Sequence, residues 1–343
     1  MSDFLRTILD AINGVVSNYG WSIVIFTMLI RLVLMPLDYR SRKSMRKMST
    51  VQGEMNRLQK KYANDKQKLN QKMTELYKKE GVSPLSGCIP MLIQWPVLFA
   101  MFAAMRAIAN EQMVAQVFRF LAGAETPIVA GESWLWIKNV WASDSIFTSI
   151  APSIESLRMI GADVWQKVYS NLGSYLTADQ VTALTASLPQ LDFSSEAFKT
   201  TLSEVLTMLQ GKDTYIATVQ AISPAWKNVS VLLFSFTVYK NWNGLLILPA
   251  LAAVTQIFMT KMNPAANGQA QPPAQQWNDA NPAASTGKFM QVFFPLLSVY
   301  FCLTSNASFA IYWVTSNIAM GIMSYGITRY LESHDKPKPP TTV

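Results

Sequence analysis

Charged residues are scarce in this 343-residue chain: 15% of the residues are Asp, Glu, Lys or Arg, whereas 50% are hydrophobic. An average soluble domain carries about 25% charged residues, so this composition argues against a soluble globular protein. The chain also has only one histidine, His334, and two cysteines, Cys88 and Cys302, which do not form a CxxC pair. We therefore expect the cysteines to be structural and expect no metal or redox site.

Long apolar stretches are what the sequence has in excess. Each is roughly long enough to cross a bilayer as a helix, and together they cover residues 20–37, 88–108, 244–260, 289–304 and 307–328. The preceding segment, residues 1–17, lacks the basic start and the cleavage site of a secretory signal, so we predict a short amphipathic helix there. The fold class predicted from these features is an all-α polytopic membrane protein.

The apolar stretches lack the residues that side-chain catalysis usually requires. An intramembrane protease or transferase needs a nucleophile with a base, or metal ligands, inside its membrane-spanning segments. The apolar stretches contain Ser and Thr but no Asp, Glu or His, and the chain has no glycine-rich phosphate loop. We expect neither enzymatic activity nor a cofactor.

The loops differ in charge, and this difference predicts the orientation. Residues 38–80 hold thirteen Lys and Arg against five Asp and Glu, whereas residues 111–227 hold seven against eleven. Because Lys and Arg collect on the cytoplasmic side, we place 38–80 and the C-terminus in the cytoplasm and the N-terminus outside. The net charge of +8 is explained by topology and by attraction to lipids or partners, not by DNA binding, because no base-reading module is present.

The chain is thus divided into ten segments. They are an extracytoplasmic amphipathic helix at 1–17, a first span at 18–39, a basic cytoplasmic hairpin at 40–82, a second span at 83–110, an extracytoplasmic segment at 111–242, a third span at 243–262, a flexible cytoplasmic linker at 263–287, a fourth span at 288–305, a fifth span at 306–330 and a cytoplasmic tail at 331–343. The linker is assigned because it is rich in Pro, Ala, Asn and Gln with little charge.

The cytoplasmic segment has the spacing of a helix that needs a partner. Its apolar residues follow a 3,4,3,4 pattern before the turn-prone ANDKQK, and three more repeat it afterwards: Met48, Val51, Met55, Leu58 and Tyr62, then Leu69, Met73 and Leu76. Gly81 and Pro84 are typical of a helix end. We predict an antiparallel helical hairpin.

The outer faces of this hairpin carry most of the basic residues of the segment. We call this set the basic face: Arg42, Lys43, Arg46, Lys47, Arg57, Lys60, Lys61, Lys66, Lys68, Lys72, Lys78 and Lys79. It could meet anionic lipid headgroups or ribosomal RNA. Alternatively, the basic face is simply solvated, and its only role is to set the orientation of the protein in the membrane.

Residues 111–235 are predicted to form a small helical domain on the opposite side of the membrane. Thr177 and Gln180 match a capping box, and the apolar series Phe198, Leu202, Val205 and Leu209 precedes Gly211. The segment has no metal, nucleotide or nucleophile pattern, so its role is not indicated.

One arginine interrupts the first apolar stretch, TMLIRLVLMPL. An arginine at the centre of a spanning helix costs about 2.5–3.5 kcal/mol, so Arg31 needs a use, whereas Arg106 lies near a helix end and can reach the interface. Thr27 lies four residues earlier, on the same helical face. Other polar residues of the apolar stretches are Gln94, Gln256, Tyr312, Trp313 and Asn317. Each alone is explained by packing between helices, but together they predict a hydrated cavity around Arg31.

Several motifs together resemble one known family. GVSPLSGCIPMLIQWP follows the basic hairpin, GWSIVIFTMLIRLVLMPL precedes it, and FAIYWVTSN lies near the end. With SWLWIKNVWASDSIF and LLILPALAAVTQIFMTKM, these motifs resemble the YidC-type membrane protein insertases of the Oxa superfamily over residues 18–147 and 243–330. The resemblance implies five transmembrane helices around a hydrophilic groove that is open to the cytoplasm and lipid and closed on the outer side.

The resemblance also implies a function and its residues. An insertase moves hydrophobic segments of new proteins from the cytoplasmic side into the bilayer, alone or with the Sec translocon. Arg31 takes the place of the groove arginine. The implied groove or client contacts are Thr27, Gln94, Gln256, Tyr312 and Trp313, to which we add Asn317. The hairpin is implied to recruit clients and to contact ribosomes or signal-recognition targeting components, in the inner membrane of a bacterium.

Two stretches depart from the family pattern. Residues from about 148 to 241 form an enlarged extracytoplasmic insertion, predicted to be helical, where many members have a much shorter connection. TSNASFAIYW lacks the usual small-residue and proline pattern, so we expect a different local bend there.

Two other functions remain open from the residues. A transporter or channel could bind an anionic solute at Arg31, although the halves show no inverted repeat. A scaffold could instead dock ribosomes through residues 40–82 without using Arg31.

Overall fold

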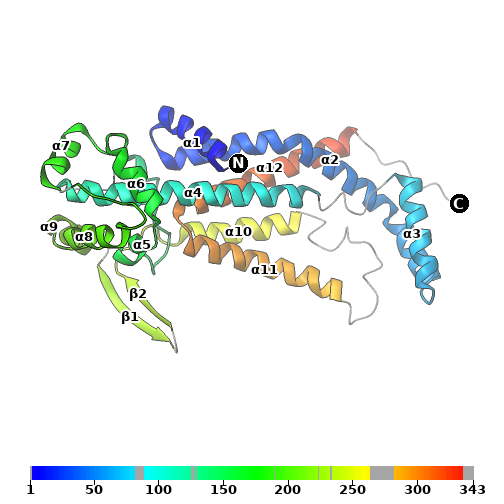
Figure 1. Cartoon of the computed structure of the whole chain (residues 1–343). Helices are drawn as coiled ribbons and strands as arrows, with labels where there is room; N and C mark the ends of the chain where they lie inside the picture. The colour runs from blue at the N-terminus through cyan, green and yellow to red at the C-terminus, as the bar shows by residue number, and fades with distance from the viewer. Residues whose placement is uncertain are drawn as a thin grey trace. The chain divides into compact units, whose positions relative to one another are not determined.

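The computed structural model describes residues 2–81, 89–124, 128, 130–188, 190–222, 224–231, 234–262 and 282–334. Among these residues the protein is mostly helical (Figure 1). The predictions for Pro84, Cys88, the Met48 and Gln94 side chains, and most of the 263–287 linker lie outside the described residues.

The helices in chain order are α1 (Ser2–Val16), α2 (Tyr19–Lys61), α3 (Lys66–Glu80), α4 (Ile89–Leu121), α5 (Ile154–Arg158), α6 (Ala162–Ser170), α7 (Ala178–Ser187), α8 (Phe198–Gln210), α9 (Asp213–Ile222), α10 (Ile247–Met262), α11 (Pro282–Thr304) and α12 (Ala307–His334). Short 3-10 turns, η1 (Ala130–Glu132) and η2 (Leu172–Ser174), and strands β1 (Ala225–Val231) and β2 (Phe234–Tyr239) complete the order. Among the described residues, Tyr19–Ser44 and Trp95–Leu121 are helical, long and apolar enough to cross a bilayer, and Ile247–Met259 and Val292–Thr304 are shorter apolar helices.

The chain forms two compact units. Unit 1 comprises Met1–Phe26, Ala100–Ala250 and Tyr300–Tyr312. Unit 2 comprises Thr27–Phe99, Leu251–Val299 and Trp313–Val343.

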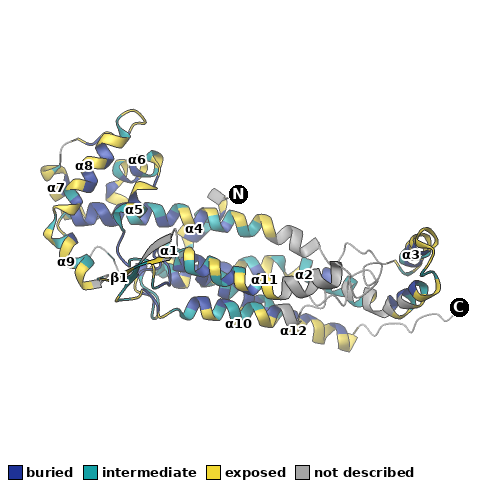
Figure 2. Cartoon of the chain, turned by 90° about the horizontal axis from the view of Figure 1, so that it is seen from below, coloured by how far each residue is buried: buried dark blue, intermediate teal, exposed yellow. Residues whose placement is uncertain are grey.

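The core of unit 1 forms around the last turns of α4. Val114, Val117 and Phe118 of this helix are completely buried. Figure 2, coloured by burial, shows buried residues on α4. They belong to one hydrophobic cluster with Trp165 of α6 and with residues of α8. Phe118 meets Trp165 edge to face, with ring centroids 6.0 Å apart. The 148–241 insertion therefore shares its core with α4, because α4 continues past residue 110, where the sequence placed the end of the second span.

Two local predictions for the insertion are confirmed. Thr177 accepts a hydrogen bond from the Gln180 backbone, and the Gln180 side chain accepts one from the Thr177 backbone, so the capping box is complete. Helix α8 buries the predicted apolar series through Leu202, Val205 and Leu209. Both features are determined by the spacing of residues that are close in the sequence, so the sequence alone could predict them.

The prediction of an all-α chain with a purely helical insertion is wrong at one place. Strands β1 and β2 pair antiparallel, with Asn228 opposite Thr237 and Val229 opposite Phe236. A register irregularity lies between Ala225 and Lys227. The segments AWKNVSV and FSFTVY combine β-branched and aromatic residues with alternating polar ones, which favours strands over helix.

A single carboxylate ties three parts of unit 1 together. Glu111 of α4 is 3% exposed and accepts hydrogen bonds from Arg6 of α1 (Nη1 to Oε1, 2.5 Å), Lys167 of α6 (2.7 Å) and the Tyr175 hydroxyl (2.9 Å). The hydrogen bond to Glu111 holds the pKa of Arg6 above its ordinary value. The N-terminal helix and the insertion are thus both attached to α4.

A second buried pair lies farther along α4. Arg119 Nη1 is 3.1 Å from Glu132 Oε1, and both side chains are almost completely buried. Gln116 also donates to Glu132, at 3.1 Å. A buried pair of this kind is costly to break, because removal of one partner leaves the other charge without compensation.

In unit 2 the second half of α2 packs on α3 as a hairpin. Val51 and Met55 of α2 form a buried cluster with Leu69, Met73 and Leu76 of α3, as the 3,4 spacing predicts. Helix α3 ends at Gly81, whose φ of 62° is in the left-handed region that glycine adopts without strain. The helical hairpin is therefore held by its own hydrophobic seam.

We expect Glu111→Gln to destabilise the protein much more than Asp10→Asn does. Both changes remove a partner of Arg6, but Glu111 is buried, whereas Asp10 is a surface partner at 3.3 Å with 45% of its side chain exposed. The buried change should cost about 3–5 kcal/mol and the exposed one below about 1 kcal/mol. Thermal unfolding in detergent measures the difference, and equal losses would contradict the assigned role of Glu111.

Candidate functional site

Arg31 of α2 is held by α12 in unit 2. The arginine is 4% exposed, and its Nε donates to Ser316 Oγ at 2.9 Å. Its Nη2 also donates to Ser316 Oγ, and Nη1 lies 3.8 Å from the Met320 sulfur. Ser316 and Met320 are one helical turn apart on α12, so one face of that helix provides both contacts. These contacts place hydrogen-bond acceptors, but no counter-charge from α12, beside the guanidinium.

A second polar contact joins α12 to α10. Asn317 is 6% exposed, and its Nδ2 is 3.2 Å from Thr255 Oγ1 and 3.2 Å from Gln256 Oε1. Consecutive residues of α12 thus bind two different helices, Ser316 to α2 and Asn317 to α10. Buried amides and hydroxyls that bond between helices in this way stabilise helix packing in a membrane, each by about 0.6–2 kcal/mol.

The structure describes the side chains of six of the seven predicted groove residues. Arg31 and Thr27 are buried on one face of α2, and Gln256 and Asn317 are hydrogen-bonded to each other. Trp313 is partly buried in unit 2, whereas Tyr312 belongs to unit 1 and is 3% exposed. Gln94 is in α4, but its side chain lies outside the described part of the chain.

Sequence reasoning missed the partners on the neighbouring helices. Ser316 and Thr255 were not singled out, although Ser316 binds the very arginine that raised the question. The available signal was the run Thr315-Ser316-Asn317, which places three polar residues together in an apolar span. Sequence alone could not identify which of the three meets Arg31, because that depends on the rotation of α12.

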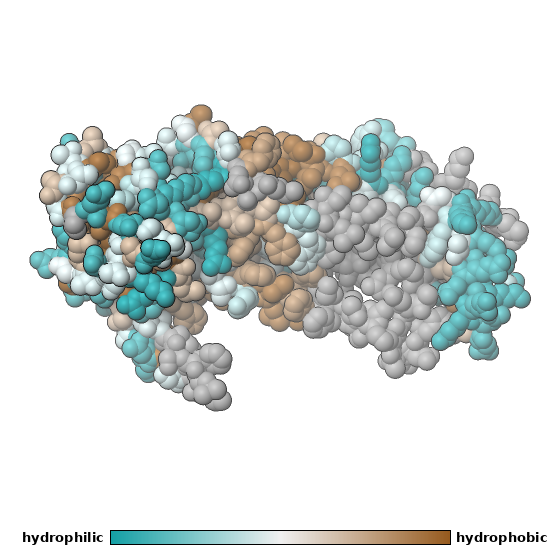
Figure 3. Space-filling model, viewed as in Figure 1, coloured by the Kyte–Doolittle hydropathy of each residue, from teal (hydrophilic) through white to brown (hydrophobic). Residues whose placement is uncertain are grey.

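The faces of α2 are arranged inversely to those of a soluble helix. Thr27 and Arg31 are 1% and 4% exposed, whereas Leu32 and Val33 are 52% and 79% exposed. Figure 3 shows hydrophobic residues along the first half of α2 and hydrophilic ones over α3. Exposed apolar residues also follow α10, α11 and α12, including Val254, Val292 and Ile322. Polar groups inside and apolar groups outside are the pattern expected of helices in lipid.

The basic face of the hairpin is open to solvent. Eight of its residues are exposed, namely Lys47, Arg57, Lys60, Lys61, Lys66, Lys68, Lys78 and Lys79. The other four are partly buried, namely Arg42, Lys43, Arg46 and Lys72. Lys72 forms a surface ion pair with Glu75 at 2.6 Å. The apolar seam between α2 and α3 leaves these cations on the outside.

A buried carboxylate fixes the start of α10 in unit 1. Asp144 accepts backbone hydrogen bonds from Leu246 at 2.8 Å and Leu248 at 2.9 Å. Burial raises the pKa of this carboxyl, and the two backbone donors oppose the shift. The loop at 139–144 and the beginning of α10 are thus connected.

Ser316→Ala should destabilise the protein, because it removes the hydroxyl that accepts two hydrogen bonds from Arg31. A hydrogen bond to a charged group contributes about 1.5–3 kcal/mol. The matched control is Ser324→Ala on the same helix: Ser324 is 2% exposed, and its hydroxyl has no hydrogen-bond partner among the described residues. We expect this control to be neutral or slightly stabilising in thermal unfolding. Equal effects of the two changes would show that the Arg31 contact contributes nothing.

Comparison with known proteins gives consistent matches. A family model described as 60Kd inner membrane protein matches residues 11–334. A protein of Fusobacterium nucleatum named membrane protein insertase YidC is 45% identical over 107 residues, 31% of this chain and 52% of the relative. One of the same name from Clostridium perfringens is 38% identical over 136 residues, 40% of this chain and 50% of the relative. Another, from Aromatoleum aromaticum, is 47% identical over 154 residues, 45% of this chain and 24% of the relative. The match thus spans about half the length of the first two relatives.

Proposed function

The chain belongs to the 60Kd inner membrane protein family, the YidC/Oxa family of polytopic membrane proteins, and we propose that it acts as a membrane protein insertase. It would move hydrophobic segments of newly made proteins from the cytoplasmic side into the bilayer, without enzymatic chemistry or a cofactor. The observation that carries this proposal is the buried Arg31, held on the polar face of a helix whose other face is apolar and exposed.

The physical obstacle in insertion is the polar flank of the client. Burial of an apolar segment in lipid is favourable by itself, whereas each unsatisfied polar group in the hydrocarbon costs several kcal/mol. Polar side chains partway across the membrane shorten the distance over which the flank lacks partners. A positive charge there also attracts acidic residues of an extracytoplasmic tail.

We propose that five transmembrane helices enclose this groove. The residues that would line the groove are Arg31, Thr27, Gln94, Gln256, Tyr312, Trp313 and Asn317. In the conformation described, Arg31 is nearly buried and bonded to a serine hydroxyl. A carboxylate is a stronger acceptor for a guanidinium than a neutral hydroxyl is. An acidic client residue would therefore displace Ser316 from Arg31, and the client would open the groove that it uses.

The remaining assignments concern topology and partners. We propose that the protein lies in the inner membrane of a bacterium, with its N-terminus outside, its hairpin and C-terminus in the cytoplasm, and its 111–242 segment outside. The exposed basic face would contact ribosomes, signal-recognition targeting components and anionic lipids. The Sec translocon would be a partner for some clients.

Arg31→Ala should reduce insertion of single-span clients with acidic tails by about tenfold or more, the effect of about 1.4 kcal/mol. Insertion of clients with neutral tails should change little, because the substitution removes only the attraction between Arg31 and an acidic tail. Arg31→Lys should restore most of the insertion. The measurement is protease protection of clients inserted into proteoliposomes that contain the purified variants.

One control and two alternative outcomes make this experiment decisive. Arg329→Ala is the matched control, since the Arg329 side chain is 68% exposed near the end of α12. Unchanged insertion of every client by Arg31→Ala would remove the role of Arg31 and favour a ribosome-docking scaffold. Arg31-dependent flux of an anionic solute without insertion would instead indicate a transporter or channel.

Ribosome binding tests the basic face separately. Lys60→Gln with Lys61→Gln should weaken co-sedimentation with ribosomes and lower the slope of log affinity against log salt by about 1.5, because each phosphate contact contributes about 0.7–0.9. The matched control, Lys199→Gln with Lys227→Gln, also removes two charges, both from exposed lysines of unit 1. Equal effects of the two pairs would mean that net charge, and not the hairpin, determines binding.

A further inference from the structure

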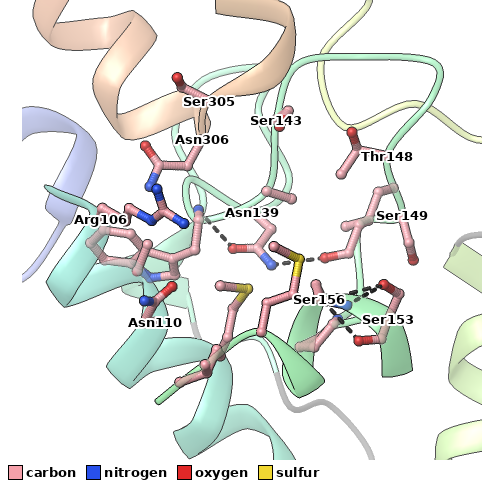
Figure 4. Close-up of a pocket in the computed structure, with 18 of the residues that line it drawn as sticks. Arg106, Asn110, Asn139, Ser143, Thr148, Ser149, Ser153, Ser156, Ser305 and Asn306 are labelled. Atoms are coloured by element: carbon pink, nitrogen blue, oxygen red, sulfur yellow. Dashed lines mark hydrogen bonds between the residues drawn. The ribbon is translucent and has the colours of Figure 1, made fainter. Parts of the chain in front are cut away.

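Unit 1 contains a cavity of about 340 Å³ between three parts of the chain (Figure 4). Phe102, Arg106 and Asn110 line it from α4. The loop from Asn139 to Ser153, with the neighbouring α5 region, forms a second wall, and residues 304–306 between α11 and α12 form the third. Its size falls within the range of about 300–1,000 Å³ that is typical of small-molecule sites.

The walls of the cavity are fixed by hydrogen bonds. Asn139 Nδ2 donates to the Ile150 carbonyl at 2.8 Å, and Asn243 Nδ2 donates to the Asn139 carbonyl at 2.7 Å. At the start of α12, the Ala307 and Ser308 backbones donate to the carbonyls of Ala142 and Val140, each at 2.8 Å. The loop is therefore held against α12, and the cavity exists without a ligand to shape it.

The polar lining is rich in donors and carries one charge. Arg106 is the only charged residue that lines the cavity, and the described part of the chain places no carboxylate in an ion pair with it. The lining also includes the hydroxyls of Thr148, Ser149 and Ser305, for which no hydrogen bond is found among the described residues. Figure 4 shows Arg106, Asn110 and Asn306 across the cavity from Thr148, Ser149 and Ser153. One cation, several hydroxyls and no acid suit a ligand with a single negative charge.

Apolar side chains complete the lining. Phe102, Met113, Trp141, Met159 and Ile160 lie beside the polar groups, and Met159 is 80% exposed. A free inorganic anion has no apolar part that could contact these side chains, whereas an amphipathic anion has one. In the proposed topology Arg106 lies near the outer end of the second span and residues 304–306 join two spans on the same side. The cavity would therefore lie at the outer interface of the membrane, where phospholipid headgroups are found.

We propose that this cavity binds the headgroup of an anionic phospholipid of the outer leaflet, a phosphodiester that carries a glycerol-type polyol. Arg106 binds the phosphate, and the hydroxyl and amide side chains bind the polyol. A headgroup with an ammonium is disfavoured, because no carboxylate lines the cavity to receive it. The placement at the outer leaflet rests on the proposed topology, but lipid binding itself needs no insertion activity.

The test is native mass spectrometry of the full chain in detergent, titrated with dioctanoyl phosphatidylglycerol or dioctanoyl phosphatidylethanolamine. We expect tighter binding of phosphatidylglycerol and a loss of about tenfold in its affinity for Arg106→Gln, the effect of one charge-assisted contact. The matched control is Arg158→Gln, which removes an exposed arginine of α5 that does not line the cavity. Ser149→Ala with Thr148→Val should lower the preference for the glycerol headgroup and leave phosphate binding intact.

Several results would overturn the proposal. Equal affinity for the two lipids would remove the headgroup assignment, and equal loss in the Arg106 and Arg158 variants would remove the site. Displacement of the lipid by inorganic phosphate or glycerophosphoglycerol at the lipid's own affinity would indicate a soluble anion. Thermal unfolding of each variant identifies any that fail to fold. Insertion measured on the same preparations separates failure of this site from failure of the insertase function.

Discussion

The burial of one guanidinium in an apolar helix is the constraint on which the arrangement of unit 2 depends. Arg31 is nearly inaccessible, yet its helix exposes large apolar residues on the opposite face. The cost of such a charge falls when other helices supply hydrogen-bond acceptors. Ser316 supplies them, and this places α12 against the polar face of α2. The apolar residues then remain on the outside, where lipid is their favourable environment.

Helix α12 connects this constraint to the rest of the unit. Ser316 binds Arg31 of α2, and the next residue, Asn317, binds Thr255 and Gln256 of α10. A rotation of α12 that released Arg31 would therefore also strain the contacts with α10. A client carboxylate that displaced Ser316 would act on both helix pairs at once, which gives the proposed groove a physical reason to open as a whole.

Sequence reasoning succeeded where the information is local. The hairpin seam, the capping box of α7 and the buried face of α8 follow from the spacing of neighbouring residues. The helical class and the unusual position of Arg31 also follow from the sequence itself. Ser316 and Glu111 were missed because their partners are 285 and 105 residues away in the chain. The β1–β2 hairpin was missed because the helical signals around it outweighed its alternating pattern, and tertiary context decides such short segments.

The insertion at 148–241 also gains a physical role from these contacts. Its helices share a hydrophobic core with the last turns of α4, and Lys167 and Tyr175 bind Glu111 on that helix. Five residues earlier, Arg106 lines the cavity of unit 1, and Thr148, Ser153 and Met159 line it from the insertion. The 148–241 segment therefore has two structural roles. It holds α4 through Glu111. It also forms one wall of the cavity, and Arg106 of α4 is the only charged residue among those that line this cavity.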